Sequence, residues 1–134
     1  MIETLLPQRY PFLFVDHIIS ADIHQTIGTK TYDHSFCFSQ EYRPMQKIIP
    51  SVILIESLVQ CGGAGVTQTG LFEKASWGIA SLENVHFYDS VSLPATVNMV
   101  IKNLKVSSKV LKQTGTASCN GHTILEATWL CLRL

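Results

Sequence analysis

Residues 50–70 read PSVILIESLVQCGGAGVTQTG, and this stretch decides the fold. Its length predicts a helix rather than a strand, although its β-branched residues lower the helix propensity. We expect the helix to run from Val52 to about Thr69. The Ser51 hydroxyl would cap its first turn, and Gly70 would end it. Because the stretch is apolar nearly all round, the helix should be buried.

Segments that read as strands lie on both sides of this helix. Two precede it, at residues 12–19 and 26–32, and four follow it, at residues 77–88, 95–107, 110–119 and 123–134. The dipeptide Asn120-Gly121 between the last two is a strong hairpin signal. Their short connections indicate an antiparallel sheet.

The remaining segments are short. Residues 1–6 are predicted to form a helical turn that Pro7 ends, and residues 33–47 have no steady period and are predicted to form a loop. A sheet wrapped around one long central helix buries the apolar surfaces of both. The sequence therefore predicts a single α+β domain over residues 1–134.

Composition limits the class of function. Hydrophobic residues make up 46% of the chain and charged residues only 15%, with a formal charge of zero, which excludes a disordered chain. No basic stripe is visible, so a nucleic-acid partner is not expected. The apolar run at residues 48–66 is interrupted by Pro50, Glu56 and Gln60, so it is a poor membrane span.

The four cysteines indicate a reducing compartment. Cys37, Cys61, Cys119 and Cys131 form no CxxC pair and have no zinc-like spacing with histidine, so we interpret them as reduced thiols and predict no metal site. The first 18 residues have no basic stretch before their apolar part, unlike a signal peptide. We therefore expect a cytoplasmic protein.

Glu56 is the most informative residue for chemistry. It lies about one turn inside an apolar helix, where a carboxylate costs several kcal/mol unless it is paired or protonated. Gln60 follows at i+4 on the same face and can hold it. Desolvation would raise the pKa of Glu56 and make it a proton donor. The alternative is a structural glutamate bonded to the backbone or to a partner subunit.

The start of the helix is a second candidate. The amides of Ser51 and Val52, just beyond Pro50, have no partner within a helix and can polarise a carbonyl oxygen. The alternative is capping by the Ser51 hydroxyl alone. The five histidines are scattered; His34 shares the predicted loop with Tyr42, and none has a partner pattern typical of a catalytic dyad or triad.

Several motifs resemble the β-hydroxyacyl-acyl-carrier-protein dehydratase family of bacterial fatty-acid synthesis. LLPQRYPFLFVDHI at residues 5–18 resembles that family's opening LLPHRYPFLLVDRV. Residues 41–60 are the counterpart of its motif GHFPGxPxxPGVLxxEAxAQ, residues 84–87 match the strand that ends in Phe, and Glu126-Ala127 match the last strand. The resemblance covers nearly the whole chain.

This resemblance implies a hotdog fold, obligate dimers and a pocket at the dimer interface. In that family a His of one subunit removes the C2 proton of a (3R)-hydroxyacyl thioester, and a Glu of the other protonates the departing hydroxyl. A backbone amide at the helix start binds the thioester oxygen. The match assigns the acid to Glu56 and the amide to Ser51. The implied substrate is carried on the phosphopantetheine of acyl carrier protein, and no cofactor is implied.

The chain departs from the family at three points. The catalytic His position holds Tyr42, the Gly at the helix start is Ser51, and the downstream Pro-Gly-Asp is replaced by residues 93–95, Leu-Pro-Ala. A phenol with a pKa near ~10, against about 6.5 for imidazole, is a poor base for a carbon acid. The difference of roughly 3.5 units corresponds to about 5 kcal/mol of proton affinity.

Three hypotheses follow. The chain belongs to a dehydratase system in which a His-containing partner supplies the base, or, in a minor form, a homodimer uses His34. Alternatively it is a non-catalytic subunit that binds acyl chains or carrier protein, or a thioesterase in which Glu56 activates water or attacks the carbonyl. All three share an acyl thioester ligand and a homodimer, heterodimer or higher oligomer. The residues expected to contact the ligand, in addition to Glu56, are Gln60, Val52, Phe87, Phe38 and Pro50.

The aromatic side chains also suit an apolar tunnel for the acyl chain. The five considered for this role are Tyr10, Phe12, Phe36, Phe38 and Phe87. Most of them are equally well interpreted as ordinary core residues.

Overall fold

The computed structural model describes residues 1–36, 47–72 and 75–134. A short 3-10 helix, η1 (Ile2–Thr4), opens the chain, where a helical turn was predicted. The helix α2 (Ser51–Thr69) is the long helix of the prediction. The described strands are β1 (His17–Ala21), β2 (Gln25–Tyr32), β3 (Trp77–Phe87), β4 (Ala95–Val106), β5 (Val110–Cys119) and β6 (His122–Arg133).

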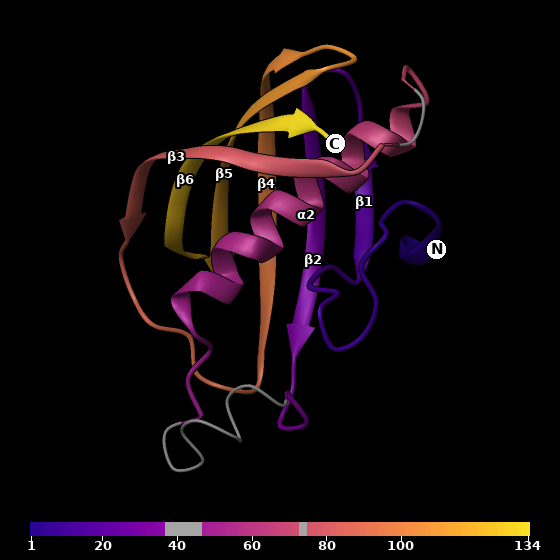
Figure 1. Ribbon diagram of the computed structural model, residues 1–134. Coiled ribbons are helices and arrows are strands. Elements are labelled where there is room, and N and C mark those ends of the chain that lie inside the picture. Colours follow the sequence, from indigo (N-terminus) through magenta and orange to yellow (C-terminus); the bar gives the residue numbers. More distant parts are fainter. Residues whose placement is uncertain (37–46, 73–74) are drawn as a thin grey trace.

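The strands form one antiparallel sheet in the order β1-β2-β4-β5-β6-β3. The sheet bends around α2, and β3 crosses on the opposite side of the helix from β4 (Figure 1). Asn120 and Gly121 join β5 to β6 with φ values of 52° and 80°, as the type I′ hairpin turn requires. The predicted α+β architecture, an antiparallel sheet around one central helix, is confirmed.

The start of α2 differs from the prediction. Pro50 is the N-cap residue, Ser51 is already helical, and no side chain caps the helix, so the predicted Ser51 cap is wrong. Pro50 has φ −58° and ψ 137°, an extended conformation that the proline ring favours. Its carbonyl accepts the first helical bonds from the amides of Ile53 and Leu54. At the other end, Gly70 ends the helix at φ 71°, as predicted.

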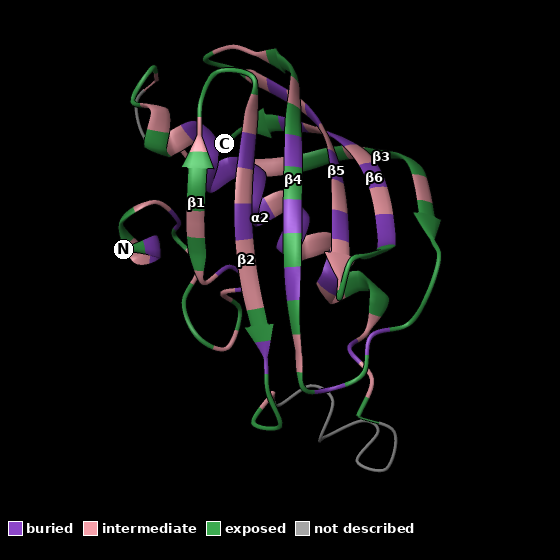
Figure 2. Cartoon of the chain, turned by 180° about the vertical axis from the view of Figure 1, so that it is seen from behind, coloured by how far each residue is buried: buried purple, intermediate pink, exposed green. Residues whose placement is uncertain are grey.

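The core lies between α2 and the concave face of the sheet. Alternate residues of the central strands are buried, which appears as purple bands on the strands in Figure 2. On β4 these are Val97, Met99 and Ile101, and they belong to the same core as Leu54, Leu58 and Cys61 of the helix. The sequence suggested that the helix is buried on all sides, and this is wrong, because Val52 is 69% exposed and Glu56 is half-buried.

The first predicted strand is the main correction to the fold. It was expected over residues 12–19, but β1 begins only at His17. Phe14 is buried without joining the sheet, because the side chain of Gln60 takes up the backbone groups that a neighbouring strand would bind. The Phe14 amide donates to Gln60 Oε1 at 2.8 Å, and Gln60 Nε2 donates to the Phe12 carbonyl at 2.9 Å.

No helix within the described ranges is long and apolar enough to cross a membrane.

Candidate functional site

A groove of about 420 Å³ runs along the side of α2 that faces away from the centre of the sheet. Besides α2, it is lined by the segment after η1, by the start of β3 and by Leu134. On the helix, the groove is lined at positions spaced three or four residues apart, which places them on one face. The lining residues are Leu5, Leu6, Pro7, Gln8, Glu56, Val59, Gln60, Gly63, Thr67, Ala75, Ser76, Trp77, Ile79 and Leu134.

Glu56 is the acidic group of this groove among the described residues. It is half-buried, and its Oε1 accepts a hydrogen bond of 3.0 Å from Gln60 Nε2. The contact that i+4 spacing predicted is therefore present. Since Gln60 holds Oε1, the remaining oxygen Oε2 is the atom on which a transferable proton would reside.

The orientation of the Gln60 amide follows from its partners. The Phe14 amide can only donate, so the Gln60 atom that faces it must be the oxygen Oε1. The other atom of the amide is therefore the nitrogen Nε2, which has two hydrogens and donates one to the Phe12 carbonyl and one to Glu56. Gln60 is 3% exposed, so it fixes Glu56 to the N-terminal segment in a largely dry environment.

The opening motif of the sequence shapes the wall of the groove. The Arg9 guanidinium donates to the carbonyls of Glu3, Leu6 and Gln8 at 2.7–3.1 Å, which holds the turn after η1 closed. Asp16 anchors the other end of the segment to β2, because it accepts from the Thr31 amide at 2.7 Å and pairs with Lys30 at 3.1 Å. Arg9 and Asp16 therefore hold in place the segment that forms this wall, but they do not themselves line the groove.

The helix start lies beside the groove rather than in it. The amides of Ser51 and Val52 precede the first intrahelical bond, so they point outward without a helical acceptor. Five residues separate Ser51 from Glu56, which is about 7.5 Å along the helix axis. The positive end of the helix dipole reinforces both amides as partners for a carbonyl oxygen.

The other sequence-predicted residues are distributed differently. Tyr42 and Phe38 lie outside the described residues. Val52 and Phe87 are exposed, at 69% and 44%, and neither they nor Pro50 line the groove in this single chain. None of the histidines at 17, 24, 34, 86 and 122, all within the described ranges, lines the groove, and His34 is exposed on the turn after β2.

Sequence reasoning missed much of the wall that surrounds Glu56. Leu5, Leu6, Pro7 and Gln8 line the groove, although they were considered only as a helical turn and the start of a motif. Their place at the head of the best-matched motif was the signal that could have drawn attention to them. The aromatic side chain of the described groove is Trp77, which was not among the five aromatics expected in a tunnel.

The described cysteines are free and are not placed for chemistry in the groove. Burial raises the pKa of the Cys61 thiol to about 12, and burial and the Glu56 charge raise that of Cys131 to about 11, so both remain protonated at neutral pH. Cys37 lies outside the described residues. Across the described ranges, no group of three His, Cys, Asp or Glu side chains is arranged to hold a metal ion.

Comparison with known proteins finds related sequences and similar solved structures. No protein-family model matches the chain. The chain is 29% identical over 135 residues to the 3-hydroxyacyl-[acyl-carrier-protein] dehydratase FabZ of Xanthomonas campestris pv. campestris (strain B100), covering 97% of this chain and 88% of that protein.

Solved structures share the architecture. A chain of the dehydratase heterocomplex ApeI:P from Xenorhabdus doucetiae superposes with a TM-score of 0.82, at 12% identity, over 99% of this chain and 90% of that chain. A hypothetical thioesterase with coenzyme A from Streptococcus pneumoniae TIGR4 gives 0.67, at 12% identity, over 88% of this chain and 84% of that chain.

The helix wrapped by an antiparallel sheet is thus a hotdog fold, which confirms the architecture that the sequence resemblance implied. Within that fold the chain is similar to FabZ dehydratases over almost its entire length, in agreement with the resemblance that the sequence motifs carry.

Proposed function

We propose that this chain supplies the acid, Glu56, in a dehydratase that acts on (3R)-hydroxyacyl thioesters of acyl carrier protein, and that a His-containing partner subunit supplies the base. The observation that carries the proposal is the placement of Glu56 in the groove, with one oxygen held by the buried Gln60. The histidines, all outside that groove, support a base from elsewhere.

The proposed reaction removes water from the acyl chain. The partner's imidazole takes the proton from C2, and electron density moves onto the thioester oxygen, where the Ser51 amide stabilises it by donating a hydrogen bond. The C2–C3 double bond then forms as the C3–O bond breaks, and Glu56 Oε2 donates its proton to the leaving hydroxyl, which departs as water. The partner's imidazolium proton restores Glu56 through solvent.

The need for a partner follows from Tyr42. Tyr42 occupies the position of the family's His, and a phenol is too weak a base at neutral pH. The structural neighbour ApeI:P is itself described as a dehydratase heterocomplex, which supports a pairing of unlike subunits. The substrate would arrive on phosphopantetheine, so the chain would need no cofactor of its own.

The test measures hydration of a trans-2-enoyl thioester by the chain alone, and by the chain co-purified with a homologue that retains the His. We expect turnover only in the mixed complex. Glu56→Gln should lower it by roughly 10²–10⁴-fold, since an amide cannot donate the proton. Glu83→Gln, at an exposed acid on β3, is the matched control and should keep full activity.

Three outcomes would overturn the proposal. Clear turnover by the chain alone would show that no partner base is required. Release of free thiol from a saturated acyl thioester, abolished in Glu56→Gln, would instead identify a thioesterase. Binding of acyl carrier protein without either reaction would identify a non-catalytic subunit.

A further inference from the structure

The groove continues along α2 well beyond Glu56. After Glu56 the helix lines it with Val59, Gln60, Gly63 and Thr67, which recur every three or four residues and share one face. Thr67 is eleven residues after Glu56, which is about 16 Å along the helix axis. The groove is therefore much longer than a reaction at Glu56 requires.

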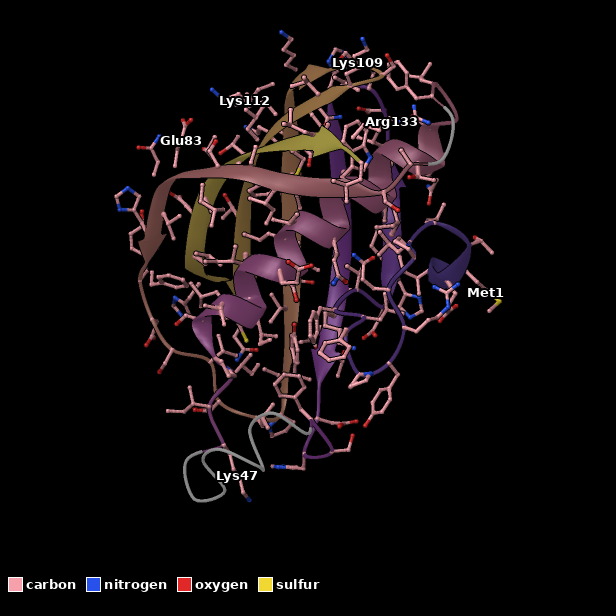
Figure 3. All side chains as sticks on the ribbon, viewed as in Figure 1. Met1, Lys47, Glu83, Lys109, Lys112 and Arg133 are labelled. Atoms are coloured by element: carbon pink, nitrogen blue, oxygen red, sulfur yellow. The ribbon has the colours of Figure 1, made fainter. Side chains whose placement is uncertain are left out.

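This extra length leads away from the proposed reaction centre. The Ser51 amide and Glu56 mark where the thioester oxygen and the C3 hydroxyl would lie, and the groove extends from Glu56 in the direction opposite to Ser51. Trp77, a lining residue from β3, pairs with Arg133 of β6. Figure 3 shows Arg133 at the end of the molecule opposite Lys47, which precedes the helix. The part of an acyl substrate beyond C3 would therefore point toward the far end of the groove.

The lining of the groove suits a hydrocarbon. Glu56 is the charged residue among the described residues that line it. The Thr67 hydroxyl donates to the Gly63 carbonyl at 3.1 Å, so its hydrogen is used within the helix. A saturated chain fits such a lining better than a charged or hydroxylated one, whose polar groups would lose water without gaining partners. The apolar residues of the other walls are Leu5, Leu6, Pro7, Trp77, Ile79 and Leu134.

Gly63 lies in the middle of this run of helical positions. It is seven residues, or about two turns, after Glu56. A Cβ at Gly63 would meet nothing closer than Trp77 Cδ1, at 3.9 Å, so packing does not require a glycine here. The helix does not favour glycine either, since it costs about 1 kcal/mol relative to alanine. The absent side chain keeps the groove open, because anything larger than a methyl group would project into it beside Trp77.

Trp77 forms the opposite side of the groove at this level. It is half-buried, and its backbone is held in the ladder between β3 and β6. Ala75 and Ser76, which precede it, have small side chains, so the indole is the bulky group that faces Gly63. The width of the groove here thus depends on two positions, a missing side chain on the helix and a large ring on the strand.

We infer that Gly63 and Trp77 set the length of acyl chain that the groove accepts, and that the missing side chain at Gly63 admits long saturated chains. The inference rests on the proposed function, which places the reacting carbons beside Glu56. Gly63 lies about 10 Å beyond Glu56 along the helix. Since each C–C bond of about 1.5 Å advances a chain by less than its own length, the groove from Glu56 to Thr67 holds roughly ten or more carbons beyond C3.

The experiment measures binding of saturated acyl-pantetheine analogues, in which an amide replaces the thioester, to the full-length chain by isothermal titration calorimetry. With acyl chains of about 4 to 14 carbons, the wild-type Kd should fall steadily as the chain lengthens, since each buried CH₂ adds to the affinity. Gly63→Leu should raise the Kd of the longest analogue by about tenfold or more and leave that of the shortest within about twofold. Gln68→Leu, at an exposed helical position outside the groove, is the matched control and should leave the whole series unchanged.

Two further variants show whether the size of the side chain at this level is the cause. Gly63→Ala, whose methyl group has room, should weaken binding of the longest analogue by a smaller factor, and it decides the question if the leucine variant does not fold. Adding Trp77→Ala to Gly63→Leu reopens the groove and should restore most of the binding of the longest analogue. Thermal unfolding of each variant checks that the fold is intact.

The outcomes separate this inference from the proposed function, because binding requires neither turnover nor a partner subunit. A length limit at Gly63 without dehydration in the mixed complex would keep the inference and sink the proposed reaction. Dehydration in the mixed complex, with the same dependence of Kd on chain length in Gly63→Leu as in the wild type, would do the reverse. An equal loss for the shortest and longest analogues, or no recovery with Trp77→Ala, would also overturn the inference.

Discussion

The two sides of α2 are built differently, although one stretch of sequence forms both. The side toward the sheet is closely packed: a Cβ on Gly62 would overlap the Gln113 side chain, and one on Gly65 would overlap Thr26. On the side toward the groove, a Cβ on Gly63 would meet nothing closer than Trp77 Cδ1 at 3.9 Å. Neighbouring glycines therefore have opposite roles, since two allow close packing and one lies beside open space.

Polar groups follow the same division. On the sheet side, Gln113 donates to the Gly62 carbonyl at 3.1 Å and accepts from Trp129 Nε1 at 3.1 Å, and Ser57 is hydrogen-bonded to the buried Tyr32 hydroxyl. On the groove side, Gln60 binds only Oε1 of Glu56, so Oε2 is available to a ligand. The first set fixes the position of the helix, and the second leaves a group available for a ligand.

The largest expected effect on stability is that of Gly65→Ala. The new methyl group would overlap the fully buried Thr26, so we expect a loss of roughly 1–3 kcal/mol or more in the free energy of unfolding. Gly63→Ala is the matched variant on the groove side, and it should gain about 1 kcal/mol from helix propensity. Urea unfolding of both variants measures the contrast, and equal midpoints would mean that the two sides are packed alike.

Next in size is Gln60→Met, which keeps the length of the side chain and removes its hydrogen bonds. The hydrogen bonds that the Gln60 side chain makes with the Phe14 amide and the Phe12 carbonyl would be lost, at a cost of roughly 1–3 kcal/mol. Turnover in the mixed complex should also fall, because Glu56 loses its donor. The exposed Gln68→Met, about two turns further along α2, serves as control. If both variants unfold at the same urea concentration, the hydrogen bonds of Gln60 have no energetic role.

The smallest effect expected is that of Thr26→Val, on the sheet side. Thr26 Oγ1 is buried with no hydrogen-bond partner among the described residues, so replacing it with a methyl group should stabilise the protein by about 1 kcal/mol. Valine keeps the shape and the strand preference of threonine. Chemical denaturation would show the gain, whereas a loss would reveal a partner for the hydroxyl.

Features that depend on neighbouring residues alone were predicted well. The long helix, its end at Gly70 and the Asn120-Gly121 hairpin all follow from local conformational preferences. The family resemblance added the hotdog architecture, whereas the role that it implies for Glu56 stays a prediction. The i+4 contact between Gln60 and Glu56 was also predictable, because helix geometry fixes that spacing.

Features that depend on contacts between residues far apart in the sequence were not predicted. The strand expected from residue 12 is displaced because Gln60, more than forty residues away in sequence, binds its backbone. The helix cap was assigned to Ser51 because serine is a good cap, yet the extended conformation of Pro50 moved the helix start by one residue. Likewise, no local pattern shows that residues 5–8 and 75–79 meet across α2.

The outer strand β3 has a consequence for how the protein is assembled. Its pairing with β6 is interrupted between Ile79 and Ser81 and again between Glu83 and His86, so no long regular stretch of backbone is offered at this end of the sheet. Irregular edges of this kind resist indiscriminate strand addition, which protects against aggregation. Any chain that paired with β3 would have to match both irregularities, which narrows the strands that could add to this edge.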